Sequence, residues 1–302
     1  MDFGSVLLRE VLNYYTLHKL FNFSDRKTKP VFGVLAAKGV DVAGEMQDLA
    51  KEISLIFSID DEVLMETYEA VKKDFRRLGP GDRIIKKGTD QYPSSLRGVR
   101  GAPPYLFLRG NAELLQKKAI SVIGTRRASQ EGKETAKKLA GDLAQEGVVV
   151  VSGLSRGIDT SVHEGALESG RPTIAVIGTP LTKASPKENE KLQEEIAKRG
   201  LVISQFPPSA PTRKWNFPKR NAVMSAISVA TAIVEAGETS GSLIQADHAL
   251  KQGRKVFIHE TLAKNSNLSW PEKYLTREGV HKFASAAEIL RLLNENSASM
   301  DG

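Results

Sequence analysis

Cationic, hydroxyl and glycine residues follow a series of short apolar segments, and their positions indicate that the chain binds an anion. The first segment, residues 119–123, is apolar and too short for a helix, and it is followed by Gly124, Thr125, Arg126 and Arg127. Similar residues follow the later segments: Ser152, Gly153, Arg156, Lys187, Phe217, Lys219, Arg220, Asn221, Ser240, Gly241 and Ser242. Parallel strands bring their carboxyl ends to one edge of a sheet, where open α/β sheets bind ligands. We therefore predict one anion site, for either a small nucleotide or a long phosphate backbone.

The distribution of charge favours a functional surface over simple solvation. The chain carries 43 Lys and Arg against 36 Asp and Glu, a net charge of +7. Nine basic residues lie in the loops that follow the apolar segments, whereas the helical segments mix both signs, as in KENEKLQEEIAKR. Because a merely solvated surface carries interspersed charges, this contrast favours an anionic ligand at the loop edge.

The segment at residues 239–242 gives the clearest indication of phosphate binding in the sequence. Its glycine permits close approach of the backbone, its hydroxyls can donate, and a helix starting near Leu243 would add free N–H groups and its positive dipole end. The simpler interpretation is that Ser240 or Ser242 only caps that helix.

Two aromatic residues lie among cations in the segment RKWNFPKRN. Trp215 and Phe217 could stack on unpaired bases, an interaction that tolerates any base sequence. We expect one of the two rings to pack beneath the loop instead.

Several catalytic chemistries find little support. The chain has no cysteine, so disulfides, thiolate metal sites and cysteine nucleophiles are excluded. Its five histidines lack metal-ligand spacing, and neither a dinucleotide glycine motif after the first segment nor a P-loop occurs. Asp159 and His163 could serve as an acid–base pair, but a helix-start cap at Asp159 with a packed histidine is the favoured interpretation. We expect no catalytic residue, cofactor or metal.

The spacing of the apolar segments predicts the fold. They begin near residues 119, 148, 173, 201, 229 and 255 and alternate with helical segments that end in glycine. Such alternation is typical of βαβ units. We therefore predict an α/β fold, a Rossmann-like doubly wound parallel sheet, over residues 119–262.

The remaining chain is predicted from helical periodicity and breakers. Residues 1–80 read as a helical N-terminal domain that ends at Gly79, Pro80 and Gly81. Residues 81–118 read as a connector with one edge element at residues 105–108. The strand pattern is expected to end after His259, so residues 263–302 are predicted to be a helical tail with a helix at residues 286–293. Neither a signal peptide nor a membrane span is predicted.

Taken together, five segments resemble the DNA-processing protein A family, also called Smf. They are QYPSSLRGVRGAPPYLFLRG, VIGTRRAS, VVSGLSRGIDTSVHEGAL, FPKRN and VEAGETSGSLIQADHALKQGRKVF, within residues 91–258. The resemblance implies a Rossmann-like domain, single-stranded DNA binding, a RecA-type recombinase as partner, a cytoplasmic homodimer and a role in natural transformation. It also implies DNA contacts from Arg126, Lys187, the Phe217-x-x-Arg220-Asn221 element and the Ser240–Ser242 turn.

The chain differs from the family pattern at several positions. Ser185 stands in place of a tyrosine, Gln205 in place of a glutamate and Ala222 in place of an arginine, and no winged-helix module is expected. The resemblance therefore leaves the pathway open, with a mobile element or phage defence as further settings.

Two other functions stay open on the residues alone. One is a small-nucleotide sensor or phosphoribohydrolase-like enzyme, for which Asp159, Glu235 and Glu238 are the candidate acids. The other is a scaffold whose basic face docks an acidic protein.

Overall fold

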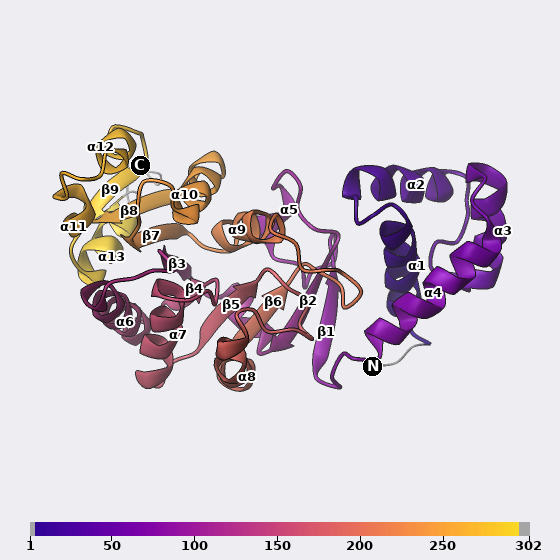
Figure 1. Ribbon diagram of the computed structural model, residues 1–302, viewed down its shortest axis with the longest axis horizontal. Helices are drawn as coiled ribbons and strands as arrows, with labels where there is room; N and C mark the ends of the chain where they lie inside the picture. The colour runs from indigo at the N-terminus through magenta and orange to yellow at the C-terminus, as the bar shows by residue number, and fades with distance from the viewer. Residues whose placement is uncertain (1–3, 296–302) are drawn as a thin grey trace.

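Four helices form an N-terminal unit in the structure, a computed structural model that describes residues 4–295 (Figure 1). They are α1 (Val6–Leu20), α2 (Asp25–Ala37), α3 (Met46–Phe57) and α4 (Asp61–Phe75). Ser5 caps α1 by accepting a hydrogen bond from the Leu8 N–H, and Asp60 caps α4 in the same way. The helical character predicted for this part is confirmed, while the predictions for residues 1–3 and 296–302 lie outside the described residues.

Within the described residues, nine strands form one sheet in the order β1-β2-β6-β5-β4-β3-β7-β8-β9. The strands are β1 (Asp82–Lys86), β2 (Tyr105–Gly110), β3 (Ala119–Gly124), β4 (Val149–Ser152), β5 (Thr173–Ile177), β6 (Leu201–Ser204), β7 (Ala230–Glu235), β8 (Lys255–His259) and β9 (Val280–Phe283). The seven neighbouring strands β6-β5-β4-β3-β7-β8-β9 pair in parallel, whereas β1 with β2 and β2 with β6 are antiparallel. The predicted Rossmann-like, doubly wound parallel sheet is confirmed.

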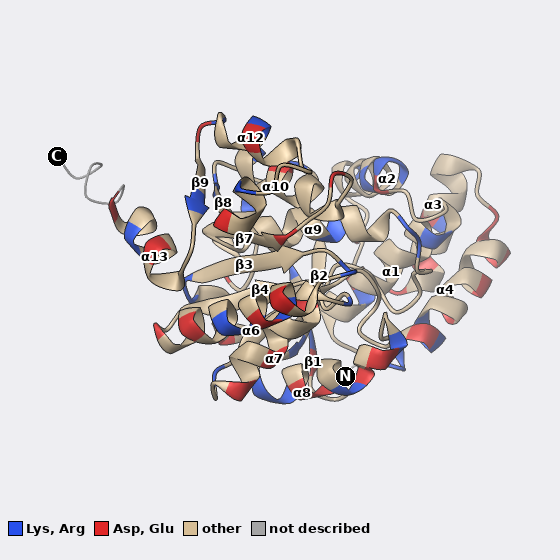
Figure 2. Cartoon of the chain, turned by 60° about the vertical axis from the view of Figure 1, so that its left-hand side comes forward, with Lys and Arg blue, Asp and Glu red and all other residues tan. Residues whose placement is uncertain are grey.

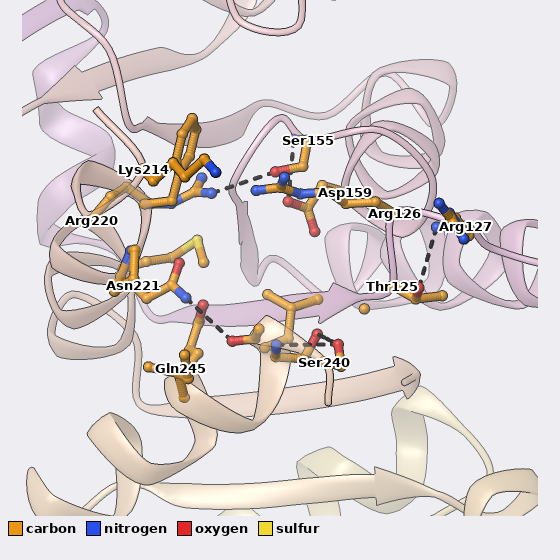
Figure 3. A pocket seen from close by; sticks show the side chains of 18 residues that line it. Thr125, Arg126, Arg127, Ser155, Asp159, Lys214, Arg220, Asn221, Ser240 and Gln245 are labelled. Atoms are coloured by element: carbon orange, nitrogen blue, oxygen red, sulfur yellow. Dashed lines mark hydrogen bonds between the residues drawn. The ribbon is translucent and has the colours of Figure 1, made fainter. Parts of the chain in front are cut away.

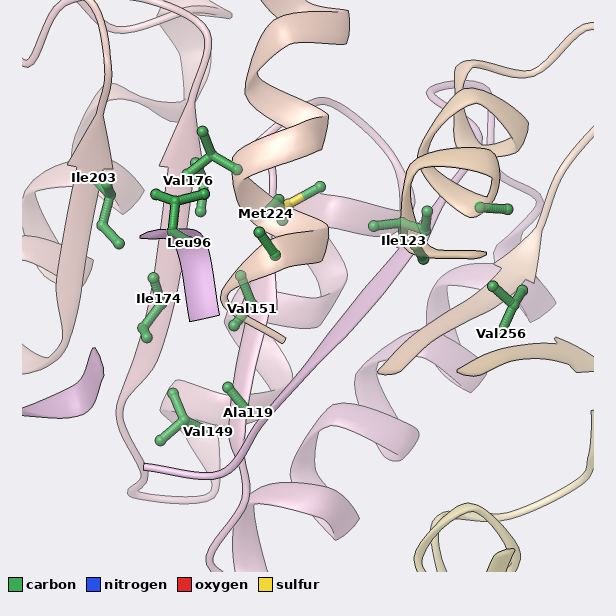
Figure 4. Close-up of a cluster of buried hydrophobic side chains, with 14 of the residues drawn as sticks. Leu96, Ala119, Ile123, Val149, Val151, Ile174, Val176, Ile203, Met224 and Val256 are labelled. Atoms are coloured by element: carbon green, nitrogen blue, oxygen red, sulfur yellow. The ribbon is translucent and has the colours of Figure 1, made fainter. Parts of the chain in front are cut away.

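Helices cover both faces of the sheet because its central strands are apolar on both sides. On β3, Ala119 and Ile123 face one cluster while Ile120 and Val122 face another, the period of two expected of a strand. The first face is covered by α5 (Ser94–Arg97), α9 (Asn216–Ala226), α10 (Gly241–Lys251), α11 (Glu260–Ala263) and α12 (Trp270–Leu275), and Figure 4 shows Met224 of α9 among its core side chains. The second face is covered by α6 (Gln130–Gln145), α7 (Ile158–Glu168), α8 (Glu190–Arg199) and α13 (Ala286–Glu295).

Two predictions about the sheet margins need correction. The predicted strand at residues 105–108 is present as β2, but β1 lies outside it and forms the edge. The expectation that strands end after His259 is wrong, because β9 pairs in parallel with β8 and extends the sheet by one strand. Both missed strands are only four or five residues long and include charged residues, so their apolar patterns are weak.

The helical unit is packed firmly against the antiparallel end of the sheet. Tyr15 and Phe75 place their rings 5.8 and 5.9 Å from that of Phe107 in β2. Glu10 of α1 accepts hydrogen bonds from the Tyr105 hydroxyl at 2.7 Å and from the Lys86 ammonium at 2.6 Å. The unit and the sheet are therefore held in a defined relative position.

No helix within residues 4–295 is both long and apolar enough to cross a bilayer. The same residues contain no group of three His, Asp or Glu side chains placed to hold a metal ion.

Candidate functional site

A pocket of about 580 Å³ opens where the strand order reverses between β3 and β7. Loops at the carboxyl ends of β3, β4, β6 and β7 contribute to it, together with the first turns of α9 and α10 (Figure 3). This is the position at which doubly wound sheets bind ligands. We call it the strand-end pocket.

The strand-end pocket brings together ten of the fifteen residues predicted from the sequence. These are Gly124, Thr125, Arg126, Arg127, Phe217, Arg220, Asn221, Ser240, Gly241 and Ser242. They come from three separate segments of the chain, so their convergence depends on the predicted crossover topology.

The charge of the strand-end pocket is positive. The exposed cations Arg126, Arg127 and Lys214 line it, and its one lining carboxylate, Asp159, is only 6% exposed. Figure 2 shows that an outer helix such as α6 instead carries both signs. A cavity with exposed cations and a buried acid attracts anions.

Arg220 lies inside the pocket wall and is only 3% exposed. Its guanidinium donates to the carbonyl oxygens of Gly153 and Val176, and lies 3.5 Å from the Ser155 hydroxyl. Burial lowers its pKa to about 10, and the charge of Asp159 opposes that effect. Arg220 thus connects the loop after β4 to strand β5, a position that its sequence motif does not reveal.

Asp159 and His163 do not form a pair by any hydrogen bond of the described residues. Burial raises the pKa of Asp159, while Arg220 and the Ser155 N–H favour its charged form. His163 is fully buried, lies 3.0 Å from the Thr173 hydroxyl through Nδ1, and has its pKa lowered by burial to about 3. The interpretation of His163 as a packed histidine is confirmed. The predicted cap at Asp159 is wrong, because the N-cap of α7 is Gly157 and Asp159 already lies within the helix.

The two aromatic residues at the start of α9 differ in exposure, as expected. Phe217 packs against Gly178, where an added Cβ would lie 2.7 Å from its ring, and the Arg126 guanidinium lies 5.3 Å above that ring. Trp215, the other ring considered for stacking on bases, is 54% exposed. A side chain at position 178 would therefore displace the ring that supports Arg126.

The first turn of α10 faces the strand-end pocket. Ser240 is the N-cap, and its hydroxyl accepts a hydrogen bond from the Ser242 N–H at 3.3 Å. The helix begins at Gly241, two residues before the predicted Leu243. Capping and anion binding are compatible here, because the cap occupies only one of the helix's free N–H groups.

Two buried N–H groups in the pocket wall lack partners within the described protein. They are Nε2 of Gln245, a residue 1% exposed, and Nε of Arg220. Gln245 was not predicted, although it lies three residues after Ser242 and thus on the same face of α10. Both groups can donate to a bound ligand.

Five predicted residues lie outside the strand-end pocket. Ser152 is buried and donates to the Val122 carbonyl at 2.7 Å, and Gly153 is buried beside Arg220. Lys187 and Lys219 are exposed, the former next to a shallow depression and the latter on another cavity.

The fifth, Arg156, lines the shallow depression of about 480 Å³ that shares Arg126 and Arg127 with the pocket. Its guanidinium forms a two-pronged ion pair with Glu188, with 2.7 Å between Nη2 and Oε2. Arg156 is therefore neutralised by a neighbour that is 32 residues away in the chain.

The acids proposed for nucleotide hydrolysis do not converge. Glu235 accepts hydrogen bonds from the N–H and hydroxyl of Ser129 at the start of α6. Glu238 accepts from the N–H and hydroxyl of Ser269. Of the three candidates, Asp159 alone lines the strand-end pocket.

Comparisons with known proteins place the chain in a family. A family model described as DNA recombination-mediator protein A matches residues 83–294. DNA processing protein DprA of Streptococcus pneumoniae is 38% identical over 234 residues, 78% of each chain, and that of Bacillus subtilis is 34% identical over 218 residues, 72% of this chain and 73% of the other.

Solved structures agree with this assignment. The X-ray structure of the Streptococcus pneumoniae protein has a TM-score of 0.73 and 32% identity, covering 92% of this chain and 97% of its own. A Helicobacter pylori DNA processing protein A, whose structure is described in terms of a single-stranded DNA binding mode, has a TM-score of 0.63 and 26% identity, covering 71% and 96%. On the extent of these matches, the chain belongs to the DNA recombination-mediator protein A family.

Proposed function

We propose that the strand-end pocket binds the backbone of single-stranded DNA. The observation that carries this proposal is the gathering of exposed Arg126, Arg127 and Lys214 around a pocket whose one lining carboxylate is buried. The Helicobacter pylori relative, described as binding single-stranded DNA, supports the choice of ligand. Cations that neutralise phosphates release counterions, which is the main source of affinity without base specificity.

Each wall of the pocket has a distinct part in this binding. The exposed cations neutralise phosphates, and the first turn of α10 offers N–H donors at its positive end. Gln245 Nε2 donates to the ligand, since no group within residues 4–295 pairs with it. Arg220 acts as a positioning residue that holds the loop after β4 against strand β5.

The protein then acts in DNA processing or recombination without chemistry of its own. Glu235 and Glu238 are engaged in anchoring loops, so the pocket lacks a second carboxylate for hydrolysis. A RecA-type recombinase as partner, a homodimeric state and a cytoplasmic location belong to the same proposal, on family membership.

Fluorescence anisotropy with labelled single strands, duplexes and mononucleotides tests the ligand class. We expect single strands to bind most tightly, Arg126→Ala to weaken binding about tenfold, and mononucleotides to compete poorly. Arg171→Ala is the matched control, because Arg171 is exposed but precedes β5 and so lies at the opposite edge of the sheet. Efficient competition by a mononucleotide would instead support the small-nucleotide function, and equal effects of the two variants would refute the assigned site.

A further inference from the structure

A second cavity, of about 800 Å³, lies between the helical unit and the sheet. The turn between α1 and α2 forms one wall, and the loop leading to α9 forms the other; Figure 1 shows that loop extending toward the helical unit. We call this cavity the aromatic cleft. Its walls include Phe23, Asp25, Arg100, Arg213, Trp215 and Lys219.

Two rings and one guanidinium form a layered arrangement in the aromatic cleft. The Arg213 guanidinium lies 5.0 Å from the Trp215 ring and 5.6 Å from the Phe23 ring. Arg213 also donates to the Asn22 side-chain oxygen at 2.7 Å, so it connects the sheet to the helical unit. Trp215 remains 54% exposed. Exposed rings beside arginines suit the stacking of unpaired bases.

The backbone that presents Phe23 is strained. Asn22 and Phe23 have φ of 52° and 60°, the left-handed region, which is unfavourable for a bulky residue such as phenylalanine. The His18 ring meets the Phe23 ring edge-on at 5.5 Å, which fixes the orientation of Phe23. The turn is thus held in an unfavourable conformation that directs an aromatic ring into the cleft.

The charge of the aromatic cleft also suits a polyanion. Four of its lining residues are cations, namely Arg26, Arg100, Arg213 and Lys219, against one carboxylate, Asp25. That carboxylate is engaged, since it lies 3.3 Å from His18 Nε2 and accepts the Tyr14 hydroxyl at 3.3 Å.

The aromatic cleft adjoins the strand-end pocket. Pro218 lines both cavities, and the adjacent residues Lys214 and Trp215 face the pocket and the cleft respectively. A single strand of DNA that leaves the strand-end pocket past Lys214 therefore reaches Trp215 next. The start of α9 is the ridge between the two.

We propose that the aromatic cleft binds the bases of the same single strand, with Trp215 as the stacking surface and the helical unit as its second wall. This inference rests on the proposed function. It adds that the α1–α2 turn is part of the nucleic-acid site and that contact with bases, and not with phosphates alone, contributes to affinity.

Tryptophan fluorescence tests this directly, because the chain has two tryptophans and only Trp215 is exposed, Trp270 being 4% exposed. Titration with an oligothymidine of about 20 nucleotides should quench Trp215, whereas an abasic strand of equal length should bind without quenching. Trp215→Ala should weaken oligothymidine binding by about 5- to 150-fold, and Trp215→Phe by much less. Phe23→Ala should weaken it as well, unlike the control Leu55→Ala at an 82% exposed position of the same unit.

The outcomes separate the two proposals. A first outcome is DNA binding that depends on Arg126 and yet neither quenches Trp215 fluorescence nor weakens in Trp215→Ala. That result would overturn the proposal for the aromatic cleft and leave the proposal for the strand-end pocket standing. Absence of binding to any oligonucleotide would overturn both. Circular dichroism of each variant establishes that a loss of binding is not a loss of fold.

Discussion

Replacement of Arg220 by methionine distinguishes a positioning residue from a direct DNA contact. Methionine is of similar length and apolar, but it removes the hydrogen bonds to the carbonyl oxygens of Gly153 and Val176. It also leaves the buried Asp159 without the positive charge that favours its ionised form. Removal of a buried cation that satisfies two buried carbonyl oxygens and whose charge favours a buried carboxylate costs about 3–5 kcal/mol. We expect the free energy of unfolding of Arg220→Met to fall by that amount at about pH 7.

The pH dependence of the stability lost in Arg220→Met shows how much of it comes from the buried Asp159 carboxylate. Burial already raises the pKa of Asp159, and without Arg220 this effect is opposed less, so the folded variant takes up a proton at higher pH than the unfolded chain. Stability is therefore regained as the pH falls through the raised pKa. The loss should be smaller at about pH 5 than at about pH 7. Asp159→Asn in the Arg220→Met background should restore part of the stability at neutral pH.

Urea unfolding followed by circular dichroism measures these differences. Arg127→Met is the matched control, since Arg127 is exposed and its change should stay within about 0.5 kcal/mol. The four variants of the Arg220–Asp159 cycle should show a coupling of about 1–3 kcal/mol. Additive effects, or an Arg220→Met protein of unchanged stability that binds DNA poorly, would refute the reasoning and make Arg220 a direct contact.

Three further changes have defined outcomes. Ser240→Ala removes the cap of α10 and should lower the free energy of unfolding by about 1 kcal/mol, measured with urea; no change would mean that the cap contributes nothing. Gly178→Ala should displace the Phe217 ring and cost about 1 kcal/mol of DNA-binding free energy by anisotropy, an effect that unchanged affinity would rule out. In the folded protein His163 stays neutral until the pH approaches its pKa of about 3. The free energy of unfolding should therefore decrease as the pH falls below the pKa of histidine in the unfolded chain. From about pH 6.5 to 5 the loss should be about 2 kcal/mol greater than in His163→Asn, and parallel pH profiles would contradict this.

Much of the fold follows from local patterns. The N-terminal part of the chain was predicted as helical from apolar spacing, and α1 begins at Val6 because Ser5 supplies its cap. The six apolar runs became parallel strands because they are short, buried on both faces and separated by crossover helices. Strand β9 was not predicted, because only Val280 and Phe283 of its four residues are buried and the apolar pattern is therefore weak.

The candidate site was predictable in its location but not in the state of each side chain. Topology brings the loop residues to one edge whatever their neighbours, so Arg126 and Ser240 were found from spacing alone. The burial of Arg220 depends on where α9 begins, and the pairing of Arg156 with Glu188 depends on a contact across 32 residues. Such long-range contacts leave no periodic signal in a single sequence.

The salt dependence of single-strand binding is the most direct test of a phosphate-binding surface at the strand ends. We assign phosphate contacts to five exposed cations: Arg126, Arg127 and Lys214, which line the strand-end pocket, Lys219, which lines the aromatic cleft, and Lys187, which is adjacent in sequence to the shallow depression. With roughly −0.7 per phosphate contact, a plot of log affinity against log salt should have a slope of about −3.5. In the Arg126→Ala/Lys214→Ala variant the slope should be smaller in magnitude by about 1.4. A slope near zero, or one unchanged in that variant, would contradict the assignment.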